Sequence, residues 1–251
     1  MEFFKALIPG KNDSEESSEY NSNISSGFKC LKILINHIWN DDFPKSWNNA
    51  LIVSIYKKGD PSDCNNYRGI SLTNNGLKII AKIIANRISK YGIDEGFIRP
   101  EQYGFRNREE YISLYTTLRN ICQRQKFENK DTYLTFLDLK KAYDSVPIYN
   151  LLMKIHHLGI RGKYYKFIEN LYLSSKACVR VDGKFSESFS IKKEVRQGCP
   201  LSSILFNFFI NDIFNKCDKY GFSIGDKRYC GGLFADDTTL CASTKSQFKN
   251  C

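Results

Sequence analysis

The stretch that most constrains the fold lies near the end of the sequence, where two adjacent acids, Asp236 and Asp237, stand between two short apolar runs. These runs cover residues 231–234 and 238–242 and favour strands, and Asp tolerates the backbone geometry of a tight turn. We therefore predict a β-hairpin with the acids at its tip. Because adjacent carboxylates repel one another, such a tip is either a solvated turn or part of a divalent-cation site.

A third acid, Asp138, ends the most strand-like segment in the first half of the chain, residues 132–139. A carboxylate at the end of a buried strand is costly unless it is paired or binds metal. Adjacent strands of one sheet would bring Asp138 beside Asp236, although 98 residues separate them. Three acids on neighbouring strand ends make a two-metal site for phosphoryl or nucleotidyl transfer.

The overall charge of the chain favours a polyanionic partner. Lysine and arginine together number 37 against 27 acids, which gives a formal net charge of +10. Such an excess favours nucleic acid before a membrane surface, with an inert basic surface as the other interpretation. No apolar run is long enough to span a membrane, so we expect no membrane partner.

The cysteines indicate an intracellular protein. There are nine of them, none in a Cys-x-x-Cys pair and none spaced from a histidine as a zinc ligand would be. We therefore expect buried, reduced thiols. The first ten residues lack the basic start and long apolar run of a signal peptide, and the choice between nucleus and cytoplasm stays open.

The apolar periodicity predicts an α+β fold, an antiparallel sheet backed by helices. Residues 10–27 are polar and aperiodic, and we expect residues 1–27 to form a flexible leader. Helices are expected over 28–40, 76–91, 110–127, 147–158, 162–173 and 201–216. Strands are expected over 50–56, 65–72 and 132–139, with hairpins over 177–191 and from residue 229 onward. In the helix over 110–127 the side chains predicted to face inward are Ile112, Tyr115, Leu118, Ile121 and Cys122.

Five ordered blocks of the sequence resemble reverse transcriptases of non-LTR (LINE-type) retrotransposons. The first three are residues 66–72, similar to the family's N-Y-R-P-I-S-L block, residues 102–106, similar to Q-x-G-F-R, and residues 136–144, similar to F-x-D-x-x-x-A-F/Y-D. The last two are residues 196–202, which resemble R-Q-G-C-P-L-S, and residues 234–237, which resemble F/Y-A-D-D. The similarity spans about residues 45–245.

The resemblance implies the right-hand polymerase fold over residues 28–251. Fingers are expected at about 45–130 and an incomplete palm at about 131–251, with the thumb missing because the chain ends 14 residues after Asp237. The implied activity is that of an RNA-directed DNA polymerase, a nucleotidyltransferase that adds dNTPs to a primer 3′-OH. Its implied partners are an RNA template, a DNA primer and dNTPs, and the oligomeric state stays open.

The resemblance also assigns roles to single residues. Asp138, Asp236 and Asp237 would be the catalytic acids and would hold two Mg²⁺ ions, with Mn²⁺ able to replace them. Arg68 would contact the incoming triphosphate. Tyr143, five residues after Asp138, would be the steric gate that prefers deoxynucleotides.

Further positions are implied in substrate and template binding. Gln197 and Gly198 would line the nucleotide and template pocket, and Asp144 is expected to be structural. The basic residues implied in nucleic-acid binding, each with a structural or solvated alternative, are Arg106, Arg108, Lys57 and Lys58. The chain departs from the family's pattern at Glu109 and Glu110, where two acids would weaken template binding.

Three alternatives stay open at this point. The first is a catalytically inactive, nucleic-acid-binding remnant, suggested by the missing thumb and by the two acids that follow the second block, Glu109 and Glu110. The second is a group II intron-type reverse transcriptase. The third, a metal-dependent nuclease of a different fold, accounts for the acids but not for the five ordered blocks.

Overall fold

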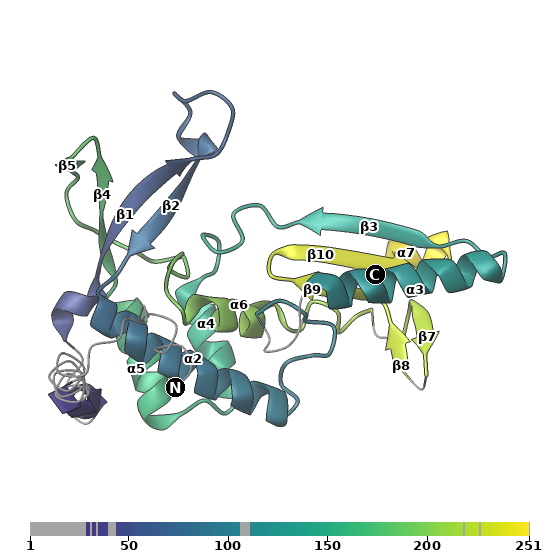
Figure 1. Ribbon diagram of the computed structural model, residues 1–251, viewed down its shortest axis with the longest axis horizontal. Helices are drawn as coiled ribbons and strands as arrows, with labels where there is room; N and C mark the ends of the chain where they lie inside the picture. The colour runs from purple at the N-terminus through teal and green to yellow at the C-terminus, as the bar shows by residue number, and fades with distance from the viewer. Residues whose placement is uncertain are drawn as a thin grey trace, which may run out of the picture. The chain divides into compact units, whose positions relative to one another are not determined.

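The computed structural model describes residues 29–30, 32–33, 35–39, 44–105, 111–217, 219–225 and 227–250 of the 251-residue chain (Figure 1). The chain divides into two compact units, Met1–Pro44 and Lys45–Cys251. The described residues of the first unit between 29 and 39 are helical, as predicted for 28–40. The predicted leader, Arg106 and Arg108 lie outside the described residues. The proposed domain boundaries stay a prediction.

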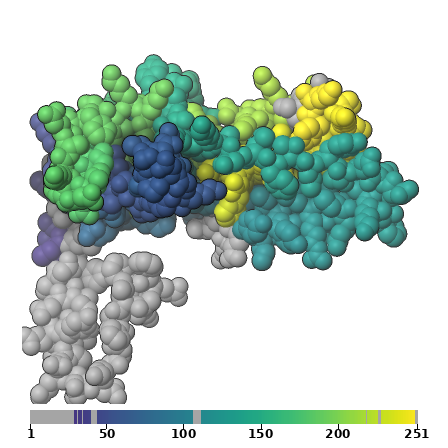
Figure 2. Space-filling view, turned by 90° about the horizontal axis from the view of Figure 1, so that it is seen from above, coloured from purple at the N-terminus to yellow at the C-terminus, as the bar shows by residue number. Residues whose placement is uncertain are grey.

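A five-stranded sheet forms one part of the second unit. A short 3₁₀ helix, η2 (Lys45–Asn48), leads into β1 (Asn49–Tyr56). After η3 (Cys64–Asn66), β2 (Tyr67–Leu72) returns antiparallel to β1. The other edge of β1 pairs in parallel with β4 (Lys176–Val181), which in turn pairs with β5 (Lys184–Phe185) and β6 (Phe189–Ser190). In Figure 2 the green surface of β4 and β5 accordingly stands next to the blue surface of β1 and β2.

The predicted hairpin over 177–191 is confirmed, including its turn. Asp182 and Gly183 both have positive φ angles, 48° and 76°, which is the backbone of the two-residue turn that suits twisted strands. Its pairing with β1 joins segments more than 100 residues apart, and nothing in the local pattern pointed to that partner.

Four helices make up the core beside this sheet. They are α2 (Asn75–Asp94), α4 (Ile148–His157), α5 (Gly162–Leu173) and α6 (Ser202–Ile210). Their apolar positions bury Leu77, Leu151, Ile168 and Phe208 completely. The predicted helix over 201–216 is wrong in its length, because α6 ends at Ile210 and turns follow. α6 lies between the two sheets in Figure 1 and is buried on almost every side.

A three-stranded antiparallel sheet forms the other part of the unit. Its order is β3 (Tyr133–Asp138), β10 (Asp237–Ala242) and β9 (Gly231–Phe234), and α3 (Tyr111–Phe127) packs against β9. The predicted acidic hairpin and the antiparallel sheet backed by a helix are therefore confirmed. A small hairpin of β7 (Phe222–Ile224) and β8 (Lys227–Tyr229), and the final helix α7 (Lys245–Asn250), were not predicted.

Two burial predictions are wrong. Ile112 and Tyr115, expected to face inward, are 65% and 50% exposed, because α3 buries the neighbouring stripe that contains Leu114 and Ile121. The stripe packs on the cluster around Tyr229. Strand β3 is not a buried strand either: among the described strands it pairs only with β10, and its C-terminal half, residues 136–138, is exposed. No helix in the described part of the chain is long and apolar enough to cross a membrane.

Candidate active site

Most of the predicted site residues line one cleft. The cleft has a volume of about 1010 Å³ and lies among β2, the loop after β3, the loop before α6 and the turn between β9 and β10. Seven of the eleven predicted positions line it: Lys57, Arg68, Asp138, Tyr143, Gln197, Gly198 and Asp236. Lys58 is exposed and does not line the cleft. The structure thus gathers residues that are up to 179 positions apart in the chain.

The three acids meet at the ends of two paired strands. In the register of β3 and β10, Asp237 is directly opposite Asp138, and Asp236 precedes it in the turn. The turn also contains Ala235, whose φ of 59° is rare for a residue with a side chain. This arrangement places Asp138 beside the Asp236–Asp237 pair, as the sequence predicted.

In the described part of the chain the three acids form no ion pair with a lysine, arginine or histidine. Burial raises the pKa of Asp237, and the negative charges of Asp236 and Asp138 raise it further. Carboxylate oxygens are the ligands that Mg²⁺ and Ca²⁺ prefer, so the donor set fits a hard divalent ion. Among the described residues, however, no three His, Cys, Asp or Glu side chains are gathered closely enough to hold an ion as they stand.

The turn that carries Asp236 is held in place by the block that resembles Q-x-G-F-R. Gln102 is fully buried and forms an isolated parallel bridge with Leu233, whose N–H donates to the Glu101 carbonyl. A Cβ added at Gly104 would lie 2.4 Å from the backbone nitrogen of Ala235. Only glycine therefore allows this approach. The described part of the block therefore supports the acidic hairpin, whereas the template-binding or structural roles predicted for Arg106 and Arg108 stay predictions.

Tyr143 forms one wall of the cleft. Its ring stacks on Phe206 of α6, with centroids 4.7 Å apart and planes 14° from parallel. Burial, and then the charge of Asp236, raises the pKa of Tyr143, so the phenol is neutral at physiological pH. The stacked ring is thus a fixed, uncharged surface beside the acids.

The loop that contains Gln197 and Gly198 is tied to β2 and to the segment that follows β3. Gln197 donates from Nε2 to Asp144 Oδ1 at 2.8 Å, and its carbonyl accepts the Ser71 N–H at 2.8 Å. Gly198 has a φ of 106°, and a Cβ there would lie 3.0 Å from the Ser71 carbonyl oxygen. Asp144 therefore holds Gln197, which agrees with the structural role expected for it.

Arg196 is a residue that the sequence reasoning missed. Its side chain is completely buried, and it donates hydrogen bonds to four acceptors in two segments, residues 47–48 and residues 171–175. These acceptors are the carbonyls of Trp47 (3.1 Å), Asn48 (2.6 Å) and Leu171 (3.3 Å) and the hydroxyl of Ser175 (2.8 Å). The signal in the sequence was the position of this arginine between Val195 and the apolar run after Gln197, which favours burial. A buried arginine needs several hydrogen-bond partners.

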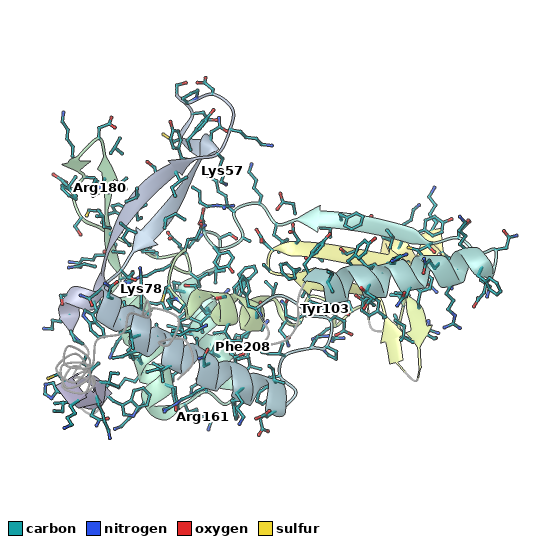
Figure 3. All side chains as sticks on the ribbon, in the orientation of Figure 1. Lys57, Lys78, Tyr103, Arg161, Arg180 and Phe208 are labelled. Carbon is teal, nitrogen blue, oxygen red and sulfur yellow. The ribbon has the colours of Figure 1, made fainter. Side chains whose placement is uncertain are left out.

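Basic side chains also line the cleft. Lys57, which Figure 3 labels near the far end of β1, and Arg68 of β2 form no ion pair within the described ranges. Lys140 and Lys141, which were not predicted as site residues, also line the cleft. Lys141 donates to Asn65 Oδ1 at 2.9 Å and so links the loop after β3 to the loop before β2. An anion in the cleft would therefore meet basic side chains as well as the carboxylates.

Comparison with known proteins identifies the class to which this site belongs. Residues 55–251 match the family model described as reverse transcriptase (RNA-dependent DNA polymerase), and the chain belongs to this family. Solved telomerase structures share the fold. They include apo telomerase of Candida tropicalis, at a TM-score of 0.55 with 14% identity over 83% of this chain and 46% of that one. Telomerase of Candida albicans has a TM-score of 0.59 with 12% identity over 80% and 38%.

Curated relatives within the family come from non-LTR elements. A Pol polyprotein from the type-1 retrotransposable element R2 of Nasonia vitripennis is 26% identical over 219 residues, which are 86% of this chain and 21% of that protein. The RNA-directed DNA polymerase from the mobile element jockey of Drosophila melanogaster is 29% identical over 206 residues, 81% of this chain and 22% of that protein. The chain thus spans about a fifth of the length of these relatives.

These findings confirm the resemblance and the fold predicted from the five blocks. They exclude a nuclease of a different fold. Reverse transcriptases as a family use divalent metal ions, which agrees with the carboxylate donor set at the ends of β3 and β10.

Proposed function

We propose that this chain carries the nucleotidyl-transfer site of a non-LTR retrotransposon reverse transcriptase. It would add dNTPs to the 3′-OH of a DNA primer, directed by an RNA template and assisted by two Mg²⁺ ions or by Mn²⁺. The observation that carries the proposal is the pairing of Asp138 with Asp237 across two strands, with Asp236 in the same cleft as Arg68 and Tyr143.

The roles of the residues follow from their positions. Bound divalent ions would offset the repulsion among the three acids, activate the primer hydroxyl and steady the leaving oxygen. Arg68, Lys57 and Lys141 would receive the triphosphate. The chain thereby supplies placement and charge neutralisation, which are the main contributions of a protein to phosphoryl transfer.

Two further residues would select the nucleotide. The ring of Tyr143 is fixed by Phe206, so it would press on the sugar and exclude a 2′-hydroxyl. Gly198 would let the backbone approach the nascent base pair closely, because it has no side chain on the cleft wall. The net charge of +10 supports nucleic-acid partners, and we propose an intracellular location on the cysteine pattern.

The test is primer extension by the full chain. A primed RNA template with dNTPs and Mg²⁺ should give extension that Asp236→Asn abolishes. Glu187→Gln, which removes a charge from an exposed position in the five-stranded part, is the matched control and should extend normally. Failure of the unmodified chain to extend in either Mg²⁺ or Mn²⁺, or normal extension by Asp236→Asn, would contradict the proposal.

A second candidate is a protein that binds RNA without polymerising. The observation that favours it is the spacing of the three carboxylates, which in this structure are not close enough together to coordinate one metal ion. This candidate requires salt-dependent RNA binding that is indifferent to Mg²⁺ and to Asp236→Asn. Extension dependent on Asp236 excludes it.

A further inference from the structure

A second pocket lies apart from the polymerase cleft. It has a volume of about 350 Å³ and is formed by α2 together with the turn between α4 and α5 and the start of α5. None of its lining residues lines the cleft that holds the acids. Figure 3 labels Arg161 of this pocket at the bottom of the view, whereas Lys57 of the cleft is near its top. The proposed polymerase chemistry makes no use of this pocket.

The charge of the pocket is positive. Arg87 of α2 and Arg161 of the turn line it from segments 74 residues apart, and no Asp or Glu is among its lining residues. Arg87 donates from Nη1 to the Tyr164 hydroxyl at 3.1 Å, while Arg161 has no ion pair or hydrogen bond within the described ranges. Two guanidinium groups without a carboxylate favour a phosphate group, which accepts several of their hydrogen bonds at once.

The walls of the pocket are aromatic. Tyr91 and Tyr164 line it, and Tyr91 is held by a tilted contact with Phe97 whose ring centroid is 5.6 Å away. Gly159 also lines the pocket with a φ of 83°, and a Cβ there would lie 2.9 Å from the Tyr91 hydroxyl. Aromatic rings beside arginines are the groups on which unstacked bases of single-stranded RNA lie.

We propose that this pocket is a binding subsite for single-stranded RNA outside the polymerase cleft. It takes one unstacked nucleotide, with the phosphate between Arg87 and Arg161 and the base against Tyr91 or Tyr164. The volume lies near the lower end of the range for small-ligand pockets, which suits one nucleotide and leaves no room for a duplex. The subsite would hold a template strand on the protein independently of the primer.

The test compares two double variants of the full chain by fluorescence anisotropy with a labelled oligouridylate. Arg87→Ala with Arg161→Ala removes both pocket cations. Lys82→Ala with Lys166→Ala removes the same charge from exposed positions of α2 and α5 that do not line the pocket. The pocket variant should lose about tenfold in affinity, and its salt slope should fall by about 0.7 for each phosphate that it no longer neutralises, while the control changes less than about twofold.

Crosslinking distinguishes RNA bound in the pocket from RNA bound in the cleft. RNA that contains 4-thiouridine should crosslink to a peptide with Tyr91 or Tyr164, and the crosslink should disappear in the pocket variant. Duplex RNA of the same sequence, and uridine monophosphate at equal nucleotide concentration, should compete poorly. Primer extension at saturating RNA should stay normal in the pocket variant.

Several results would overturn this proposal without bearing on the polymerase site. They are equal losses in the two double variants, an unchanged affinity of the pocket variant, crosslinks confined to residues of the cleft, and equal competition by duplex RNA or free nucleotide.

Discussion

Replacing Arg196 by methionine tests whether one buried side chain holds the loop of Gln197 and Gly198 to the core. The change removes hydrogen bonds to the carbonyls of Trp47 and Leu171 and to Ser175, all in buried surroundings, and one to the half-buried carbonyl of Asn48. Methionine has a similar length, so the packing volume is largely kept while the acceptors lose their donor.

The expected cost follows from those hydrogen bonds. A buried acceptor left without a donor costs about 1–3 kcal/mol, but water can reach Asn48, the bond to Leu171 is long, and the desolvation of the guanidinium is recovered. We therefore expect the free energy of unfolding to fall by about 3–5 kcal/mol. The free energy of unfolding of Arg196→Lys should lie between those of the unmodified chain and Arg196→Met. The ammonium group of lysine keeps the charge but lacks the planar fork of donors that reaches acceptors on separate segments.

Equilibrium urea denaturation measures this change. Trp47 is one of only two tryptophans, and its carbonyl accepts from Arg196, so fluorescence reports on this junction alongside circular dichroism. Arg180→Met on β4, at the exposed arginine labelled in Figure 3, is the control and should change the free energy of unfolding by less than about 0.5 kcal/mol. A loss below about 1 kcal/mol in Arg196→Met would refute the reasoning.

Three further outcomes are expected. Tyr143→Ala should raise incorporation of ribonucleotides relative to deoxynucleotides, measured as a ratio of kcat/KM values; an unchanged ratio would remove its role as gate. Gly104→Ala should lower the free energy of unfolding by about 2 kcal/mol or more, because the methyl group meets the Ala235 backbone; an unchanged urea midpoint would contradict this. Burial, and then the charge of Asp144, raises the pKa of Glu194 from 4.5 to about 7, so the folded chain keeps a proton that the unfolded chain releases. Stability should therefore fall as the pH rises through that interval, and Glu194→Gln should flatten this profile of melting temperature.

Local patterns predicted the elements of the fold but not all their partners. The Asp182-Gly183 turn and the acidic hairpin came from short-range signals that depend on the backbone of a few residues. The parallel pairing of β1 with β4 depends on which apolar faces meet after folding, and no local signal encodes that. The burial of α3 failed for the same reason: two apolar stripes run along this helix, and only the tertiary contact decides which one is covered.

At the site, motif spacing predicted which residues gather and missed what supports them. Asp138 and Asp236 line one cleft because β3 and β10 are neighbours in the sheet. The spacing of the motifs was compatible with this pairing but did not establish it. Arg196 and Gly104 were in the quoted blocks but had no role assigned. Their functions are a buried hydrogen-bond network and a close backbone contact, and both become visible only when distant segments are in place.

The acids show that the cleft is arranged for charge that the chain alone does not neutralise. The pKa of Asp237 is raised by burial and by Asp236 and Asp138, and because Asp237 is exposed, water screens much of this repulsion. A site selected only for stability would replace one acid by an amide. Instead the fold holds all three at adjoining strand ends and supports them through Gly104 on one side and the stacked ring of Tyr143 on the other. Three like charges kept together on a rigid support are therefore an arrangement that a bound divalent cation would stabilise.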